Sequence, residues 1–222
     1  MLRDLINTAS DNRLQRLRRA LFSGVIIAIA ITLFWQLQAF RQLQLGLTDV
    51  YFAPTQTSGE VVIIALDDAS LSRFGRSPAT WSRSVYVDML DKLSGARVVA
   101  FDLLFSETSD ADREFAAALS RLRDADSRTR IVLASAGTQA FFPQAQQNES
   151  KALHFSNALT PVDTLRTTAD YLGYVNILPD ADGSIRRQPS QIIVAENTQY
   201  SFSVATYLAY LRIPRQAVQQ IV

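Results

Sequence analysis

Three aspartates have the residue type and spacing that first suggest a functional site. Asp67 and Asp68 directly follow the apolar run Val61–Leu66. Asp102 directly follows a second run, Val98–Phe101. Carboxylates that converge from two segments can hold a divalent cation or a cationic ligand, because hard cations prefer oxygen ligands, and with a metal they can support phosphoryl chemistry. The structural alternative is that the first two aspartates cap the turn after their run, while Asp102 accepts backbone N–H groups in its own loop.

Both apolar runs are predicted to be strands of one sheet. Continuous apolar runs of this length, closed by acidic residues, are typical of strands buried on both faces. Between them, Ser82–Gly95 carries apolar residues at helical spacing. A strand, a helix and a strand in this order predict a βαβ unit with parallel strands. The three aspartates are then expected at the carboxyl edge of the sheet, where open α/β sheets bind ligands.

The remaining elements predict an α/β fold class, with a mixed, mostly parallel sheet flanked by helices and a C-terminal antiparallel hairpin. The predicted helices are Asp112–Arg123, Asp163–Ala169 and Ser201–Leu211, and the third strand is Ile131–Ala134. The hairpin is expected to join Leu172–Ile177 to Ile185–Val194, because Asp182-Gly183 between them is a strong turn signal. The span Thr138–Ser156 has little periodicity and is expected to be a surface excursion.

An uncharged apolar segment near the N-terminus predicts a transmembrane helix. Ala20–Trp35 contains no charged residue, and extension through Phe40 brings its length to the thickness of a bilayer core, about 30 Å at about 1.5 Å per residue. Arginines crowd the preceding residues, so the positive-inside rule places the N-terminus in the cytoplasm and the later chain outside. The alternatives are a cleaved signal peptide, which also exports the domain, and a buried core helix.

The chain is therefore predicted to have four parts. A basic cytoplasmic N-terminus covers residues 1–19, the transmembrane helix covers 20–40, a connector covers 41–59, and the α/β domain covers 60–222.

Composition excludes several functional classes. The net charge of +1 leaves no large basic field, so no nucleic-acid partner is expected. The absence of cysteine excludes disulfides, thiol nucleophiles and zinc–thiolate sites. The single histidine, His154, has no acidic or serine partner at a useful spacing, which argues against a hydrolase triad. We expect no catalytic residue, no metal site and no cofactor.

The turn between the predicted hairpin strands carries a second group of charges. Asp180-Ala181-Asp182-Gly183 is similar to the start of a calcium loop, but the residue at position twelve is Gln191, so a hairpin turn is the better interpretation. Arg186 and Arg187 follow this turn on a predicted strand, whose alternation points them to opposite faces. One can then pair with an aspartate and one can contact an anionic ligand. A structural ion pair or a solvated face is the alternative.

Five separated blocks agree in order and spacing with a known family. The blocks are Val61–Arg76, Trp81–Leu93, Gly95–Glu107, Gly173–Pro189 and Ser201–Ala209. Over about residues 45–212 the chain resembles the CHASE2 extracellular sensory domain. Members of that family are bacterial sensor regions that follow one N-terminal membrane helix, precede further membrane helices, and feed a cytoplasmic adenylate cyclase, histidine kinase or Ser/Thr kinase.

The resemblance also singles out residues and marks departures. Relatives carry a Trp-Pro-Trp-Pro-Arg-like run where this chain has Pro78-Ala79-Thr80-Trp81-Ser82-Arg83. Arg83 is expected to pair with an acidic strand end, and Trp81 either covers a pocket or packs into the core. The predicted ligand-binding set is Asp67, Asp68, Trp81, Arg83, Asp102 and Arg186. The later membrane helices and the output domain are absent, so the chain is expected to be a fragment or a stand-alone member.

These observations predict a sensor domain of a bacterial signalling protein, anchored in the inner membrane and facing the periplasm or cell exterior. The resemblance implies an unassigned small-molecule or envelope cue, a homodimer, and a cytoplasmic cyclase or kinase output that lies outside this chain. Two alternatives stay open: an exported metal-dependent enzyme that uses Asp67, Asp68 and Asp102, and an envelope interaction module.

Overall fold

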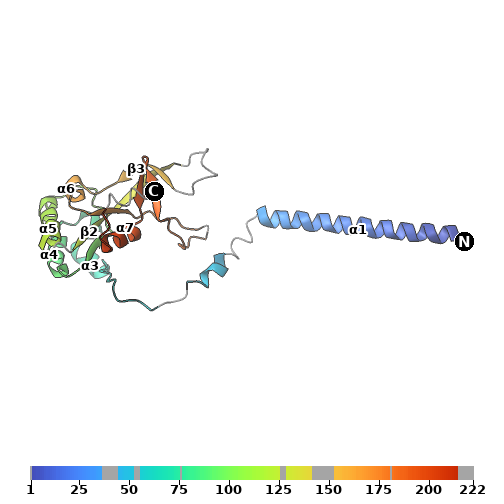
Figure 1. Ribbon diagram of the computed structural model, residues 1–222, viewed down its shortest axis with the longest axis horizontal. Helices are drawn as coiled ribbons and strands as arrows, with labels where there is room; N and C mark the ends of the chain where they lie inside the picture. The colour runs from blue at the N-terminus through green and yellow to red at the C-terminus, as the bar shows by residue number, and fades with distance from the viewer. Residues whose placement is uncertain are drawn as a thin grey trace. The chain divides into compact units, whose positions relative to one another are not determined.

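The structure is a computed structural model that describes residues 2–36, 45–52, 56–75, 77–125, 129–141, 153–180 and 182–214. The chain divides into two compact units, Met1–Val62 and Ile63–Val222. Figure 1 shows the elements of both units.

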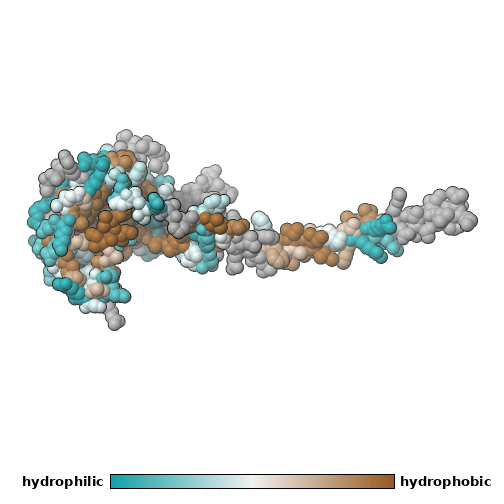
Figure 2. Space-filling view, turned by 90° about the horizontal axis from the view of Figure 1, so that it is seen from below, coloured by the Kyte–Doolittle hydropathy of each residue, from teal (hydrophilic) through white to brown (hydrophobic). Residues whose placement is uncertain are grey.

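The first unit contains the long helix α1 (Leu2–Gln36) and a short helical stretch at residues 45–49. Within α1, the 21 residues Gln15–Trp35 form a helix long and apolar enough to cross a membrane by length and composition. Figure 2 shows hydrophobic residues gathered along the C-terminal half of α1. All residues from 15 to 35 are exposed within this unit. The predicted end of the span at Phe40 lies outside the described residues.

The second unit is built on a six-stranded mixed sheet whose central strand is β2 (Arg130–Phe141). The first half of β2 lies between two parallel partners, β1 (Val98–Phe101) and β4 (Tyr171–Tyr174). Its second half pairs in antiparallel orientation with β3 (His154–Leu159). The sheet then continues through β5 (Gln191–Val194), parallel to β3, to β6 (Asn197–Tyr200), antiparallel to β5. The predicted α/β class with a mixed, mostly parallel sheet is confirmed.

Helices cover both faces of the parallel part of the sheet. These are α4 (Ser84–Leu90), α5 (Asp112–Ala125) and α7 (Phe202–Tyr210). The unit also contains α3 (Asp68–Phe74), which buries no residue, and the short helix α6 (Asp163–Arg166). Ile131 and Leu133 belong to one core cluster, while Val132 between them belongs to a cluster with two alanines of α7. Because successive strand residues point to opposite faces, α7 lies on the face opposite to α4 and α5.

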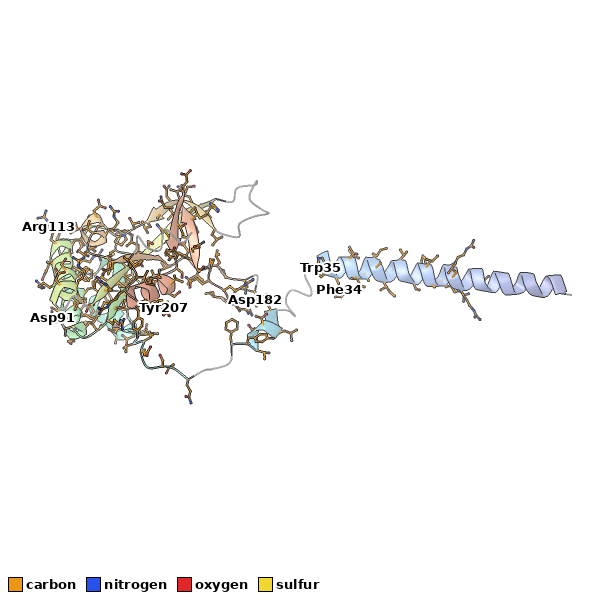
Figure 3. All side chains as sticks on the ribbon, in the orientation of Figure 1. Phe34, Trp35, Asp91, Arg113, Asp182 and Tyr207 are labelled. Atoms are coloured by element: carbon orange, nitrogen blue, oxygen red, sulfur yellow. The ribbon has the colours of Figure 1, made fainter. Side chains whose placement is uncertain are left out.

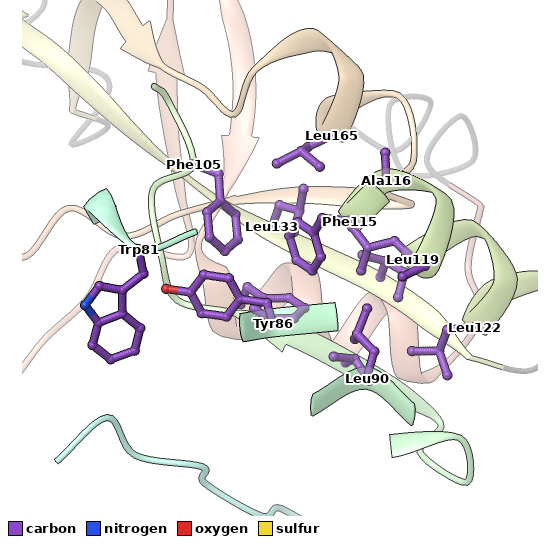
Figure 4. Packing of buried hydrophobic residues seen from close by; sticks show 14 residues of the cluster. Trp81, Tyr86, Leu90, Phe105, Phe115, Ala116, Leu119, Leu122, Leu133 and Leu165 are labelled. Atoms are coloured by element: carbon purple, nitrogen blue, oxygen red, sulfur yellow. The ribbon is translucent and has the colours of Figure 1, made fainter. Parts of the chain in front are cut away.

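The larger core lies between the sheet and the α4–α5 face (Figure 4). Its centre is aromatic: the Phe101 ring meets the rings of Tyr86, Phe105 and Phe115 edge-on or nearly so, at centroid distances of 6.2, 5.7 and 5.5 Å. Edge-to-face contacts of this kind add specific attraction to the burial of apolar area. On the other face, a Cβ at Gly173 of β4 would lie 2.5 Å from the Phe202 Cα, so glycine permits the close approach of α7.

The first predicted strand is wrong. Val61–Leu66 forms no strand in the described chain, and Val61, Val62 and Ile63 are 80%, 81% and 85% exposed. The predicted βαβ unit is therefore not formed, although its helix and its second strand, Val98–Phe101, are present. An apolar run shows the capacity to form a strand, but the strand itself requires a neighbouring backbone with which to pair.

The C-terminal antiparallel hairpin is present but joins other strands than predicted. It connects β5 to β6 through Ala195 and Glu196, which have φ angles of 44° and 72°. Positive φ at both loop residues is typical of a two-residue hairpin turn. The Asp182-Gly183 signal does form a turn, with the Gly183 N–H donating to the Asp180 carbonyl at 2.9 Å. A turn signal marks a reversal of the chain, but it does not determine which strands pair across it.

Other boundaries also shift. The predicted surface excursion Thr138–Ser156 begins and ends in strands, because β2 extends to Phe141 and β3 begins at His154. Residues 142–152 lie outside the described part of the chain. The predicted helices at Asp112, Asp163 and Ser201 are confirmed, with small shifts in their ends.

Candidate functional site

Asp67 is the N-cap of α3. Its Oδ1 atom accepts hydrogen bonds from the Ser70 N–H at 2.9 Å and from the Ser70 hydroxyl at 2.8 Å. These bonds, first of all the one from the backbone N–H, lower the pKa of the Asp67 carboxyl. Asp68 lies in the first turn of the same helix, where the helix dipole favours negative charge. Capping of the segment after Leu66, the alternative to a binding role, therefore accounts for the positions of Asp67 and Asp68.

Asp102 is exposed directly after β1, and no hydrogen bond reaches its side chain from the described residues. The part of the chain that the structure describes holds no group of three or more acidic or histidine side chains that could bind a metal ion. Asp67, Asp68 and Asp102 therefore do not converge there into the oxygen-ligand cage that a hard cation requires.

Arg83 is buried in the core rather than facing a cleft; its side chain is 1% exposed. Its Nε donates to Asp112 Oδ1 at 3.3 Å, its Nη2 donates to the Glu107 carbonyl at 2.9 Å, and its guanidinium lies 4.7 Å from the centre of the Phe105 ring. Asp112 also accepts the Ser109 N–H at 2.7 Å. The carboxylate that pairs with Arg83 at this distance belongs to the first residue of α5 and not to a strand-end aspartate.

This buried cluster joins three segments around the end of β1. Arg83 precedes α4, Glu107 lies in the loop after β1, and Asp112 begins α5. A buried charge is tolerated only when it is paired and hydrogen-bonded, and Arg83 meets that condition. We therefore assign it a bracing role for the loop that follows β1.

Trp81 packs into the core instead of covering a pocket. It is 4% exposed, its Nε1 donates to the Gly75 carbonyl at 2.8 Å, and its ring stacks on Tyr86 with the centroids 6.3 Å apart. Of the two roles predicted for Trp81, the structure shows core packing.

A second charged cluster closes the loop after β4 (Figure 3, Asp182). Arg186 donates to Asp180 at 3.2 Å and to both oxygens of Asp182 at 3.0 and 2.9 Å. Arg187 donates to Asp180 at 2.7 Å. The prediction that the two arginines point to opposite faces is wrong, because both reach the same carboxylate from a segment that is not a strand.

These ion pairs hold the two aspartates in the charged form. The hydrogen bond from Arg187 and then the one from Arg186 lower the pKa of Asp180. The hydrogen bond from Arg186 is the main reason that the pKa of Asp182 falls to about 2. The Arg186 guanidinium is engaged within its own loop, because it bonds to both aspartates and its side chain is only 7% exposed.

A pocket of about 370 Å³ opens elsewhere, where β2 and β4 begin and α7 ends. It is lined by Arg130, Ala169, Asp170, Tyr171, Ala209, Arg212, Ile213 and Pro214. Sequence reasoning missed it, because the lining comes from three segments that are distant along the chain and carry no shared motif. It lies at the amino end of the parallel strands, whereas the sequence predicted a site at their carboxyl end.

Asp170 organises the pocket wall. One of its oxygens accepts from Arg130 Nη1 at 3.1 Å, and the other accepts the Ile131 N–H at 2.8 Å. The Tyr171 hydroxyl donates to the Ile213 carbonyl and so links the start of β4 to the chain that leaves α7. Guanidinium, carboxylate and apolar groups thus line the pocket together, and the Asp170 carboxylate is already paired with Arg130 and the Ile131 N–H.

The CHASE2 domain family matches residues 25–221 of this sequence. The chain belongs to the CHASE2 domain family. Neither a curated protein nor a solved structure matches it. CHASE2 is an extracellular sensory domain family, so the predicted recognition is confirmed and a sensory, non-catalytic class is supported for this segment. The apolar part of α1 can anchor a CHASE2 domain in a membrane.

In this CHASE2 domain the six predicted ligand-binding residues lie in separate structural settings. Two occupy the start of α3, Asp102 is exposed after β1, Trp81 and Arg83 are buried in the core, and Arg186 is paired within its loop. Their role in ligand binding stays a prediction.

Proposed function

We propose that this chain is the sensory region of a membrane-anchored bacterial signalling protein. The observation that carries the proposal is the CHASE2 match over residues 25–221, in a chain whose α1 is apolar enough to cross a membrane. In this proposal residues 1–19 are cytoplasmic, α1 crosses the inner membrane, and the α/β domain lies in the periplasm or outside the cell. The basic residues before the apolar segment support that orientation.

Reporter fusions test the topology. We expect alkaline phosphatase fused after Gly59 to be active and green fluorescent protein fused at the same position to be dark. At a fusion point before Arg16, we expect alkaline phosphatase to be inactive and green fluorescent protein to be fluorescent. A fluorescent reporter after Gly59 would overturn the proposed orientation.

We place the cue in the pocket between β2, β4 and α7. Arg130, Asp170 and Arg212 supply polar groups, and the last described residues, Ile213 and Pro214, form part of its wall. A molecule bound there touches the chain where it leaves α7, so differential binding in two states can be passed to the following segment.

Thermal-shift screening of the full chain in detergent against small carboxylates, phosphates and amino acids tests this site. A compound that raises the Tm of the wild type should lose its effect in Arg130→Gln, which removes the charge beside Asp170. Arg166→Gln is the matched control, because Arg166 forms an exposed pair with Asp163 away from the pocket. An equal shift in wild type and Arg130→Gln would remove the pocket from the proposal.

The resemblance to family members with cyclase and kinase outputs supports a proposal for the output and the assembly state. We propose that the domain works as a homodimer and controls a cytoplasmic adenylate cyclase or kinase. The reading frame beyond residue 222, or the neighbouring gene, should encode that output. Sedimentation of the full chain in detergent tests the homodimer, and a single monomeric species would contradict it.

A further inference from the structure

The outer edge of β1 is open. Within the described chain β1 pairs only with β2, and the Arg130 N–H of β2 donates to the Arg97 carbonyl at 3.0 Å. Alternation along a parallel ladder then directs the backbone groups of Val98 and Ala100 away from β2. An exposed strand edge of this kind is a template for a further strand.

The segment Ile63–Leu66 has the properties of such a strand. Ile63 is 85% exposed and Ile64 is 53% exposed, and no strand of the described chain pairs with the segment. Short uncharged segments with β-branched residues form strands readily and associate with one another when they stay exposed. Folded proteins cover or pair them, so this stretch requires a partner.

The C-terminal end of this segment is already held beside β1. Leu66 is partly buried and packs against the core cluster that contains Val99 and Phe101 of β1. The chain from Asp67 to Arg97, which contains α3 and α4, is much longer than the dozen or so residues that a parallel crossover needs. The tether at Leu66 favours pairing within one chain over pairing with a second copy.

We propose that Ile63–Leu66 docks as a parallel strand on the outer edge of β1 of the same chain, and that the structure shows this segment in its released, unpaired state. With Leu66 on the core face, strand alternation places Ile64 on the α4 side, where Val85 and Met89 are only partly buried. Ile63 and Ala65 then lie on the α7 face, where the exposed Ala100 lies.

Docking also bears on signalling. It removes four residues from the free connector between α1 and the sheet, so the docked and released states differ at the segment that leads to the membrane helix. A cue that binds one state better shifts the balance between them. This second step rests on the proposed sensory function, whereas the pairing itself does not.

Disulfide crosslinking tests the pairing, because the native chain contains no cysteine. In the full chain in detergent, Ala65→Cys with Ala100→Cys places both thiols on the α7 face, and the spacing of neighbouring strands, about 4.8 Å, lies within the Cα–Cα range that a disulfide spans. We expect a crosslink within one chain under mild oxidation, seen as a faster-migrating monomer on a non-reducing gel. Ile63→Cys with Ala100→Cys covers a register shift by two residues. Ile64→Cys with Ala100→Cys is the matched control and should not crosslink, because its side chain lies on the other face.

A charge substitution distinguishes a crosslink that depends on docking from one that forms by random contact of the two thiols. Ile64→Asp should abolish the Ala65–Ala100 crosslink, because docking places the carboxylate against the apolar α4 side. Val61→Asp, outside the docked segment, should leave it unchanged. Circular dichroism and Trp81 fluorescence identify any variant that fails to fold.

Two outcomes overturn the proposal. The absence of a crosslink in both the Ala65 and Ile63 pairs excludes docking on this edge. A crosslink found only between chains instead assigns the edge to a strand exchanged with a second copy. Neither outcome depends on membrane topology or on a cue, so the reporter fusions and the thermal-shift screen still test the proposed function separately.

Discussion

Two apolar runs of this chain, Val61–Leu66 and Val98–Phe101, share their local chemistry and differ in their surroundings. Each is a short apolar stretch that is followed by an aspartate, and the second also ends in the aromatic residue Phe101. The second lies beside β2 and buries Val99 and Phe101 to 7% and 5% exposure. The first leaves Val61, Val62 and Ile63 at 80% exposure or more. The contrast shows that an apolar run forms a strand only where a neighbouring backbone supplies hydrogen-bond partners.

The segments that follow the two runs differ in the same way. After Phe101, the loop is closed by the buried Arg83–Asp112 pair and by the Arg83 bond to the Glu107 carbonyl. After Leu66, the chain enters α3, and the exposed residue Asp67 caps the start of that helix. Removing one partner of a buried pair is costly, whereas exposed polar contacts contribute little. The stability of the domain is therefore expected to depend on the second run and its loop.

The largest expected effect comes from Phe101→Ala. Loss of a buried ring that meets three other aromatic rings should lower the free energy of unfolding by about 3–5 kcal/mol. Val61→Ala is the control in the other run and should change it by less than about 0.5 kcal/mol. Urea unfolding of the full chain, followed by the fluorescence of Trp81 in a Trp35→Phe background, measures both. An equal loss of unfolding free energy in the two variants would contradict the expected difference between the two runs.

An effect of similar size is expected in the loop after β1. Arg83→Met should destabilise the domain by about 3–5 kcal/mol, because it leaves the Asp112 carboxylate buried without its countercharge. The double variant Arg83→Met/Asp112→Leu should be more stable than the single variant, since it removes both charges. Arg166→Met, at an exposed pair, should change stability by less than about 1 kcal/mol. A double variant no more stable than Arg83→Met would show that the pair is not energetically coupled.

A smaller effect is expected at the two strand-end aspartates. Asp67→Ala removes the acceptor for the Ser70 N–H and should lower the Tm by about 2–4 °C. Asp67→Ser should restore most of that loss, because serine also caps helices. Asp102→Ala should leave the Tm unchanged, since no described residue bonds to its side chain. Differential scanning calorimetry separates the three variants, and an equal loss at Asp102 would contradict the assignment.

The smallest effect is in acid. The Ser70 N–H lowers the pKa of Asp67 from its ordinary value of 3.8, and Arg186 lowers the pKa of Asp182 to about 2. A carboxyl whose folded pKa is lowered stabilises the folded state fully above its unfolded pKa, and loses this contribution as the pH falls through the folded pKa. The Tm of the wild type should therefore fall between pH 4 and pH 2. Asp182→Asn should reduce that fall more than Asp67→Asn, and the reverse order would contradict the contacts described above.

Several elements could be predicted because local pattern alone identifies them. Val98–Phe101 has the predicted bounds, and the helix that begins at Asp112 begins there in the structure. The apolar segment after the basic N-terminus and the five family blocks can also be recognised in the sequence. Each of these depends on periodicity, charge or residue order within one stretch.

The candidate sites could be predicted only in part. The capping alternative for Asp67 was correct because a cap depends on residues three positions apart. The partner of Arg83 lies 29 residues away, and no spacing rule connects the two. The pocket combines residues near positions 130, 170 and 212, which become neighbours only when β2, β4 and α7 pack together.

The class of the domain, its family, the apolar N-terminal helix and the capacity of both runs to form strands can be predicted from residue order and pattern. Which runs pair depends on the packed fold: β4 lies parallel to β2, the hairpin joins β5 to β6, and Val61–Leu66 stays outside the sheet. The physical reason is that side-chain pattern sets a local preference, whereas pairing requires two backbones and a shared core to come together. Asp67, Asp68 and Asp102 looked like one site because both runs were expected in one sheet, and they separate when only one run pairs.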